Sequence, residues 1–476
     1  MIKGLGAYPE YKDSGLPWLG EVPAHWEVRR MRDTASACVA GIWGGEPDGQ
    51  NDLVCVRVAD FDRARLRVRL DHPTLRSIGP SERRRRLLSR GDLLLEKSGG
   101  GDQQPVGVVV LFDHDVEAVS SNFVAKLTVS ERYDPKYLVY LHSTLYELNL
   151  NARSIKQTTG IQNLDTSAYL SEGVALPALA EQAAIVHFLD HADRRIQRYL
   201  RAKQKLIKLL EEQKQATIRG AVTRGLDPNV SLKPSGIEWL GDVPEHWDVV
   251  RAARICQFLP GKAHEQFIEP DGEFVCATAR FVSTEGRTAR HCSVNLCPAR
   301  IGDVLMVMSD LPRGRALARA YYVDDDGKYA VNQRVCVLRA HAINSQFLAY
   351  YANRNPQLLT HDDGSNQTHL PNAAFKTMLV LVPPPEEQAA IVTALLRLTG
   401  GIDRIVARAR REIALLDEYR TRLIADLVTG KLDVRGAAAR LSDEGHEVLA
   451  LDEVSATDDD DHETDDLEHV SGEAEG

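Results

Sequence analysis

The chain has 476 residues, of which 43% are hydrophobic and 26% are charged, and its formal net charge at pH 7 is −10. This length predicts two or more globular domains, each able to bury a core without disulfides or metals. The longest apolar runs, such as Val106–Phe112, are too short to span a bilayer, and the first residues lack the apolar core of a signal peptide. Seven scattered cysteines, an odd number, favour a reducing cytosol over a secreted disulfide scaffold.

The charge is unevenly distributed along the chain. Residues 441–476 contain fifteen Asp or Glu and no Lys or Arg, which leaves 53 acidic and 58 basic side chains in residues 1–440. The body is therefore mildly basic, and this permits a nucleic-acid partner without requiring one. We expect residues 436–476 to form a disordered acidic tail. The tail either competes with DNA for the basic body or only raises solubility.

The first predicted element is a short motif that occurs twice. "GLPWLGEVPAHWEV" (Gly15–Val28, here called the opening motif) returns as "GIEWLGDVPEHWDV" (Gly236–Val249), with nine of fourteen positions identical. Each copy holds two tryptophans and a histidine at the same spacing. Stacking of the tryptophans on bases is one interpretation. We favour a structural role, because the motif is constant while the sequences that follow its two copies differ.

The segment after the first motif contains strand-like runs, such as Leu53–Val58, and many arginines. In "RARLRVRL", Arg63, Arg65, Arg67 and Arg69 occupy alternate positions, so in a single strand all four would face one side. A run that includes Arg83 and Arg84 follows. Arginine neutralises phosphates and reads guanine by paired hydrogen bonds, so both sets are candidate DNA contacts. The alternative is a solvated strand face and a charged helix surface.

A glycine-rich loop, "EKSGGGDQQP" (Glu96–Pro105), follows a predicted buried strand. Glycines allow close backbone approach to phosphates, and glutamine pairs with adenine in the major groove. The order of residues is not that of a Walker A loop. Candidate DNA-binding residues here are Lys97, Ser98, Gly99, Gly100, Gln103 and Gln104, with Gln157 and Thr158 from a later polar loop. A plain hairpin turn is the alternative.

Residues 177–226 predict one long helix, preceded by Pro177 and followed by Gly225. Apolar residues at alternating spacings of three and four predict a coiled-coil seam. The proposed seam positions in this helix are Leu189, Ile196, Tyr199, Leu206 and Leu210. Residues 1–176 before the helix form the first predicted domain.

The second half of the chain, residues 227–382, predicts a second domain with similar landmarks. "GDVLMVMSDLP" (Gly302–Pro312) resembles "GDLLLEKSGGG" (Gly91–Gly101), and the polar segment Ser365–Leu370 takes the place of Gly160–Leu164. The corresponding candidate DNA-binding residues are Ser309, Arg313, Arg315, Asn366 and Gln367. Each half is therefore predicted to combine a common α and β frame with different contents.

A second long helix is predicted over residues 383–435. "EQAAIV" occurs at Glu181–Val186 and again at Glu387–Val392, at the same distance before each helix end. The proposed seam positions here are Leu395, Ile402, Ile405, Leu416 and Leu423, with Leu398 also in the pattern. Two helices of equal length at the ends of two repeats are expected to pair antiparallel. The predicted fold class is α+β, with two pseudo-symmetric mixed domains separated by a pair of long antiparallel coiled-coil helices.

The sequence shows no convincing catalytic or metal-binding motif. The "NPQL" stretch at Asn355 lacks the second proline and aromatic residue of an adenine methyltransferase loop, and Glu96-Lys97 lacks the nuclease ExK spacing. His291, Cys292 and Cys297 have neither a CxxC pair nor a second cluster at zinc-ligand spacing. We predict no catalytic residues and no metal.

In this order, the motifs resemble the specificity-subunit family of type I restriction–modification systems. The resemblance rests on Tyr11–Val28, its copy Leu232–Val249, the two "EQAAIV" helices and the join "RGLDPNVSLKPSGIEWLG" (Arg224–Gly241), and it covers nearly all of the chain except the acidic tail. It implies a non-catalytic cytoplasmic protein of a bacterium or archaeon. Two target-recognition domains would each read one half of a bipartite double-stranded DNA site. The helices would set the spacing and dock two methyltransferase subunits.

The same resemblance implies that restriction–translocase subunits complete the complex. No cofactor is expected on this chain, and S-adenosylmethionine, ATP and magnesium are expected on the partner subunits. Because the two interiors differ, we predict unlike half-sites and an asymmetric full site. Two other hypotheses stay open at this point: a coiled-coil scaffold that binds proteins, and an enzyme with an unrecognised site.

Overall fold

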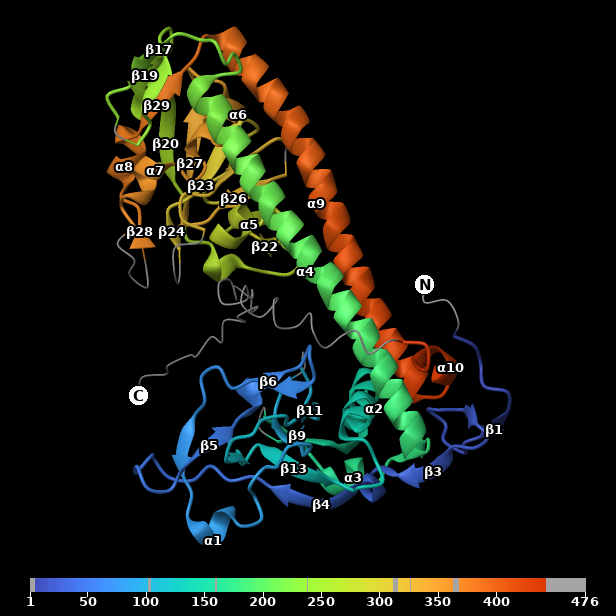
Figure 1. Cartoon of the computed structure of the whole chain (residues 1–476). Coiled ribbons are helices and arrows are strands. Elements are labelled where there is room, and N and C mark those ends of the chain that lie inside the picture. Colours follow the sequence, from blue (N-terminus) through green and yellow to red (C-terminus); the bar gives the residue numbers. More distant parts are fainter. Residues whose placement is uncertain are drawn as a thin grey trace. The chain divides into compact units, whose positions relative to one another are not determined.

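The computed structural model describes residues 5–441, except 102–103, 159–160, 238, 311–315, 326 and 363–367. The chain divides into two compact units (Figure 1). Unit 1 comprises Met1–Arg201 and Ile413–Gly476, and unit 2 comprises Ala202–Glu412. The predicted acidic tail lies almost entirely outside the described residues. Among the residues that are described, no helix is both long enough and apolar enough to cross a membrane.

Each unit begins with the same small β-structure, built from the opening motif or its copy. In unit 1, β1 (Tyr11–Asp13) pairs antiparallel with β2 (Glu21–Pro23), and β3 (Glu27–Arg30) pairs with β16 (Gly173–Leu176). In unit 2, β17 (Leu232–Pro234) pairs with β18 (Asp242–Pro244), and β19 (Asp248–Arg251) pairs with β29 (Leu379–Val382). The β3–β16 and β19–β29 pairs, here called the stems, each join the two ends of a variable interior.

The interiors share one sheet topology. The largest sheet of unit 1 has the order β4-β13-β9-β11-β7-β6, and that of unit 2 has the order β20-β27-β23-β25. The unit 1 strands are β4 (Ala35–Ala40), β13 (Val124–Val129), β9 (Leu93–Glu96), β11 (Val109–Leu111), β7 (Arg67–Val68) and β6 (Phe61–Asp62). The unit 2 strands are β20 (Cys256–Pro260), β27 (Val335–Ala340), β23 (Asp303–Val307) and β25 (Ala320–Tyr322). Strands β4, β13, β9 and β11 therefore correspond to β20, β27, β23 and β25.

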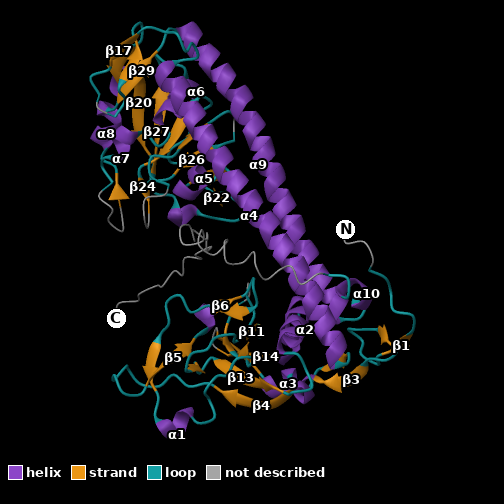
Figure 2. Ribbon diagram, viewed as in Figure 1, coloured by secondary structure: helices purple, strands orange, loops and turns teal. Residues whose placement is uncertain are grey.

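A second sheet is also common to both units (Figure 2). It has a parallel and an antiparallel pair around a central strand, in the order β12-β5-β8 or β26-β21-β22. Its strands are β12 (Ala118–Ser120), β5 (Asp52–Val56), β8 (Leu75–Ser77), β26 (Tyr329–Val331), β21 (Phe274–Ala277) and β22 (Arg290–Cys292). The short helices are α1 (Pro80–Arg83), α3 (Thr166–Tyr169), α5 (Ala279–Ser283), α7 (Pro356–Leu359), α8 (Asn372–Thr377) and α10 (Arg435–Ala438).

The central strands β9 and β23 are buried on both faces, which explains their continuous apolar sequences. In β9, Leu93 and Leu95 pack in the core that includes α2 (Pro135–Glu147), and Leu94 packs in a separate cluster with Phe112. The two clusters lie on opposite faces because side chains alternate along a strand. In unit 2, β23 is arranged in the same way, beside α6 (Ser345–Ala352).

Two long helices, α4 (Leu179–Arg224) and α9 (Pro385–Val428), lie within the predicted segments 177–226 and 383–435, and α9 ends before the predicted bound at residue 435. Within unit 1, the first half of α4 contacts the last half of α9, and Arg420 forms an ion pair with Asp193. Within unit 2, Lys203 pairs with Glu412 at 2.6 Å and Lys214 pairs with Asp403 at 2.6 Å. The two contacts in unit 2 run in opposite directions along the helices, so the predicted antiparallel pairing is present there.

The predicted register of the helix seam is wrong at four positions: Tyr199, Leu206, Leu398 and Ile405 are exposed. The buried positions instead include Leu200, Thr399 and Val406, each one residue further along. An α-helix has 3.6 residues per turn, so a strict alternation of three and four drifts away from the contact face. Steps of four from Ile196 to Leu200 and from Leu395 to Thr399 correct this drift.

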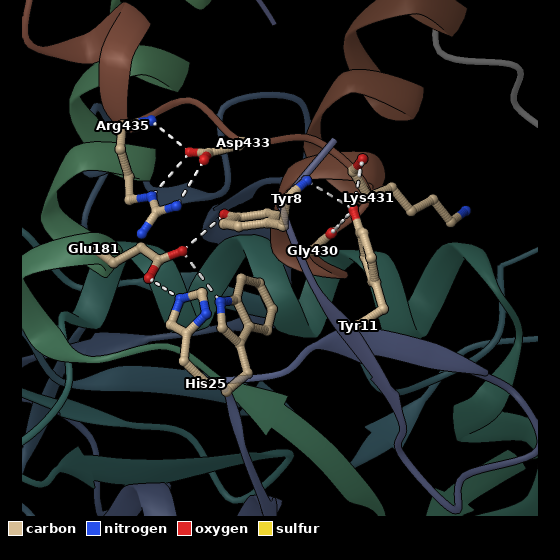
Figure 3. A network of polar contacts seen from close by, with 9 residues as sticks. Tyr8, Tyr11, His25, Glu181, Gly430, Lys431, Asp433 and Arg435 are labelled. Atoms are coloured by element: carbon tan, nitrogen blue, oxygen red, sulfur yellow. Dashed lines mark hydrogen bonds and ion pairs between the residues drawn. The ribbon is translucent and has the colours of Figure 1, made fainter. Parts of the chain in front are cut away.

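The repeated motifs meet inside each unit through one glutamate, Glu181 in unit 1 and Glu387 in unit 2. In unit 1 the Trp26 Nε1–H donates to Glu181 Oε1 at 3.1 Å, and His25 Nε2 lies 2.7 Å from Glu181 Oε2 (Figure 3). In unit 2, Trp247 and His246 contact Glu387 Oε2 at 3.0 Å and 2.8 Å. This contact explains why the opening motif and "EQAAIV" are both repeated, and it confirms the structural interpretation of Trp26 and Trp247.

The glutamine of "EQAAIV" fixes the helix that covers the sheet. Gln182 accepts from the backbone N–H of Asp134, the N-cap of α2, and Gln388 accepts from that of Asn344, the N-cap of α6. Each N-cap side chain also accepts two backbone N–H groups in the first turn of its helix. The long helices therefore set the position of each variable interior through its stem and its covering helix.

Candidate nucleic-acid interface

The glycine-rich loop and the later polar loop of unit 1 are adjacent in the structure. Strand β10 (Ser98–Gly99) pairs antiparallel with β15 (Ile161–Leu164), which pairs in turn with β14 (Ile155–Thr158). The Ser98 hydroxyl donates to Asn163 Oδ1 at 2.6 Å. Two segments about sixty residues apart in the chain thus form one small sheet, which we call the loop sheet.

Unit 2 contains the same arrangement with different residues. Strand β24 (Ser309–Asp310) pairs antiparallel with β28 (Thr368–His369), and the Leu370 N–H donates to Met308 O at 2.8 Å. In unit 1 the equivalent bond runs from Leu164 N–H to Lys97 O, also at 2.8 Å. The predicted counterparts therefore occupy equivalent places in the two units. Arg313, Arg315, Asn366 and Gln367 lie outside the described residues.

Glycine is required in the unit 1 loop for a structural reason. Gly99 and Gly100 both have positive φ, at 121° and 56°. A Cβ on Gly100 would lie 2.8 Å from Gln104 O and 2.9 Å from Val106 N, closer than real contacts allow. These two glycines therefore shape the loop, and their predicted contact with phosphate stays a prediction. Gln104 and Gln157 are exposed, whereas Gln103 and the Thr158 side chain lie outside the described part.

The prediction that four alternate arginines share one strand face is wrong. Strand β6 ends at Asp62 and β7 begins at Arg67, and a turn lies between them in which Leu66 has a φ of +55°. The Asp62 carboxylate stabilises this turn by accepting the backbone N–H of Arg65 at 2.9 Å. Arg67 alone of the four lies within a strand, and Arg69 pairs with Asp71 at 3.1 Å.

Arg63 lies beside a buried carboxylate instead. Glu96, only 1% exposed, is the last residue of β9, two residues before the first residue of β10, and its Oε2 is 3.2 Å from the Arg63 guanidinium. Burial raises the pKa of Glu96, and the Arg63 charge opposes that rise. The equivalent residue of unit 2 is Val307, which is apolar and buried. The residue that ends the central strand before the loop sheet is therefore charged in unit 1 and apolar in unit 2.

The arginine run lies at the end of the large sheet. Arg83 ends α1 and Arg84 follows it, exposed to solvent. The Arg86 Nε–H donates to Ala40 O, the last residue of β4, at 3.1 Å. The backbone N–H of the next residue, Gly41, bonds to Val124 O. The Arg86 guanidinium therefore lies near the turn between β12 and β13.

The candidate metal ligands do not form a site. Cys292 is buried and its thiol donates to Val294 O, while His291 Nδ1 lies 3.2 Å from Gly272 O. Across the described residues, no group of three or more His, Cys, Asp or Glu side chains is placed to hold a metal ion.

The chain is similar to known proteins over most of its length. A family model for the type I restriction modification DNA specificity domain matches residues 300–414. A Methanocaldococcus jannaschii protein assigned as the MjaX type I restriction enzyme specificity subunit is 22% identical, and the alignment covers 88% of this chain and 96% of that protein. The MjaVIII specificity subunit of the same organism is 23% identical over 61% of this chain and 70% of that protein. The chain belongs to the specificity-subunit family of type I restriction–modification systems.

The fold agrees with this assignment. A chain from a solved structure on "complex assembly and conformational transition of the type I R-M system" matches with a TM-score of 0.62 at 17% identity, covering 86% of this chain and 98% of that one. In this specificity subunit, the matched segment 300–414 contains β24 and β28, so it includes the loop sheet of unit 2. The predicted family and fold class are therefore confirmed.

Proposed function

We propose that this specificity subunit recognises an asymmetric bipartite DNA site, with one half read by each unit. The observation that carries the proposal is a constant frame with unlike contents. The stems, the central strands and the loop sheets recur in both units, whereas residues of the loop sheets differ (Gly99 and Asn163 in one, Asp310 and His369 in the other). The shared frame would present different side chains to DNA at equivalent positions. Different side chains select different base edges.

Methylome sequencing of cells that express this chain with its methyltransferase partners tests the proposal. We expect one motif with two different half-sites, separated by a constant number of unread bases, because helices α4 and α9 would hold the units at a fixed spacing. A single continuous motif, or two motifs that occur independently, would contradict the proposal.

The isolated chain supplies the control for this experiment. Binding of several phosphates releases counterions, so its affinity for duplex DNA should fall steeply with salt, by about tenfold or more between 50 and 200 mM. A scaffold that binds only proteins would show no salt-dependent affinity for duplex DNA. Methyl transfer by the purified chain alone would instead indicate an enzyme, since we propose that S-adenosylmethionine, ATP and magnesium bind only to the partner subunits.

We also propose that exposed apolar residues of the long helices dock the methyltransferase subunits. In unit 1, Leu415 on α9 is 63% exposed and Tyr199 on α4 is 55% exposed. In unit 2, Leu206 and Leu209 on α4 are exposed. Apolar side chains gathered on a helix surface favour a protein partner, since their burial removes apolar area from water.

The double variant Leu206→Asp/Leu209→Asp should weaken docking. Burial of each leucine contributes roughly 1.5 kcal/mol or more, so the pair predicts a loss of affinity of about 100-fold. Co-purification with the methyltransferase subunits would measure it. Gln204→Asp, an exposed position on the same helix, is the matched control and should have little effect. Equal loss in the control, or no loss in the double variant, would place docking elsewhere.

A further inference from the structure

Two turns in equivalent positions of the units have matching backbone bonds and different side chains. We call Ser121–Phe123, between β12 and β13, and Asn332–Arg334, between β26 and β27, the paired turns. Each is closed by the same bond: Val124 N–H to Ser121 O at 3.0 Å, and Val335 N–H to Asn332 O at 2.9 Å. The first residue of each turn is buried, and the next two face outward to different degrees.

The paired turns are attached directly to the candidate interface. In unit 1, Phe123 O accepts the N–H groups of Lys97 and Ser98, at 2.9 Å and 3.3 Å. In unit 2, Arg334 O accepts those of Met308 and Ser309, at 2.8 Å and 3.4 Å. Each turn is therefore hydrogen-bonded to the first residue of the loop-sheet strand and to the residue before it.

A glycine packs against the other side of each turn. A Cβ on Gly41 would lie 2.1 Å from Ser121 O, and one on Gly261 would lie 2.0 Å from Asn332 O. The N–H groups of these glycines donate to Val124 O and Val335 O, respectively, at 2.9 Å and 3.0 Å. With both sides held, the backbone presents its outward residues in a fixed geometry, as precise readout of a ligand requires.

The outward residues are chemically suited to base edges, and they differ between the units. Unit 1 presents Asn122, which is exposed, and Phe123, which is 47% exposed. Unit 2 presents Gln333 and Arg334, and among the described residues the Arg334 guanidinium has no hydrogen bond or ion pair. Arginine reads guanine O6 and N7 with two hydrogen bonds, and phenylalanine contacts the methyl group of thymine. Gln333 is already engaged with Glu265, at 3.4 Å.

We propose that Phe123 and Arg334 are specificity-determining residues, each reading one base pair of its half-site. Arg334 would select guanine, and Phe123 would select thymine through its methyl group. The inference rests on the proposed DNA-reading function and adds residues that lie outside the loops predicted from the sequence. Two different half-sites require different side chains at equivalent positions of the two units. The paired turns supply such side chains.

Methylome sequencing of the full complex tests the inference with Arg334→Ala and Phe123→Ala. We expect Arg334→Ala to lower the preference for guanine at one position of one half-site by roughly 5- to 150-fold, and to leave the other half-site unchanged. Phe123→Ala should relax one thymine position in the opposite half-site. Arg254→Ala and Val116→Ala are matched controls, because these exposed residues precede β20 and β12 at the ends away from the turns.

Several results would overturn the inference. To cover the case in which Arg334→Ala abolishes modification entirely, binding of the purified complex to duplexes varied at single positions is measured as well, at low salt. An equal loss of affinity for every duplex would make Arg334 a phosphate contact or a structural residue, contrary to the proposal. An unchanged motif in both variants would also overturn it. Failure of the proposed function is distinct, since the wild-type complex would then show no bipartite motif.

Discussion

Replacing residues 31–172 with a second copy of residues 252–378 should convert an asymmetric recognition site into a symmetrical one. The chimera would carry the unit 2 interior in both units, so the half-site of unit 2 should occur twice and the other half-site should disappear. The two helices exchange roles between the units, since α4 supplies its first half to unit 1 and its last half to unit 2. We therefore expect the repeated half-sites to be inverted.

The stems make this exchange structurally conservative. In unit 1, Arg30 pairs with Gly173 and the Met31 N–H donates to Glu172 O at 2.9 Å. In unit 2, Arg251 pairs with Leu379 and the Ala252 N–H donates to Met378 O at 2.8 Å. The ends of the exchanged segments therefore lie next to equivalent stem hydrogen bonds in both units.

Contacts beyond the stem are also matched. The incoming α6 would offer its N-cap N–H to Gln182, as it does to Gln388 in its own unit. Methylome sequencing would read the new motif, and the reciprocal exchange is the control, because it should give the other symmetrical site. A chimera that folds and keeps the original asymmetric motif would show that the interiors do not carry specificity.

Glu181→Ala should destabilise unit 1 far more than Glu387→Ala destabilises unit 2. The Glu181 side chain is 7% exposed, and its Oε1 accepts a hydrogen bond from the Tyr8 hydroxyl at 2.7 Å in addition to the tryptophan and histidine contacts. Burial and the hydrogen bond to Glu181 raise the pKa of Tyr8, so this hydroxyl stays protonated and donates. Loss of the carboxylate would leave buried donors without an acceptor, at a cost of roughly 3–5 kcal/mol in the free energy of unfolding.

Glu387 provides a matched comparison within the same chain. Its side chain is 28% exposed, and among the described residues its carboxylate has only the tryptophan and histidine contacts. We therefore expect Glu387→Ala to lower the free energy of unfolding by about 1–2 kcal/mol. Hydrogen exchange at β3 and β19 would report each unit separately. Exchange at β3 should accelerate by about 100-fold or more in Glu181→Ala. Equal effects of the two substitutions would mean that burial and Tyr8 do not strengthen the first contact.

The chain's N-terminal and C-terminal segments add to this asymmetry in unit 1. Tyr11 donates its hydroxyl to Gly430 O at 3.2 Å, and the Arg435 guanidinium lies 5.1 Å from the centre of the Tyr8 ring (Figure 3). Arg435 also pairs with Asp433 at 2.7 Å. These contacts surround Glu181 with packed groups, which accounts for its deeper burial compared with Glu387.

The sequence by itself determined the duplicated architecture. Repeats at a fixed offset, proline before each long helix and apolar runs in "GDLLLE" and "GDVLMV" are local patterns, and local patterns predict helices, buried strands and internal symmetry. The same motifs were specific enough to indicate the family. The equivalence of the glycine-rich loop with "SDLP" also followed from alignment of the two halves.

Only the tertiary structure decided which residues meet. The contact between Trp26 and Glu181 joins positions 155 residues apart, and no periodicity encodes such a pairing. The helix register depended on which face could be buried, so Leu200 replaced Tyr199 in the contact. The predicted strand face of alternate arginines does not form, because a turn interrupts the strand. The Asp62 side chain stabilises this turn by its hydrogen bond to the backbone of Arg65. The paired turns became visible once backbone bonds placed Phe123 and Arg334 beside the loop sheets, because long-range hydrogen bonding depends on the folded backbone rather than on residue order.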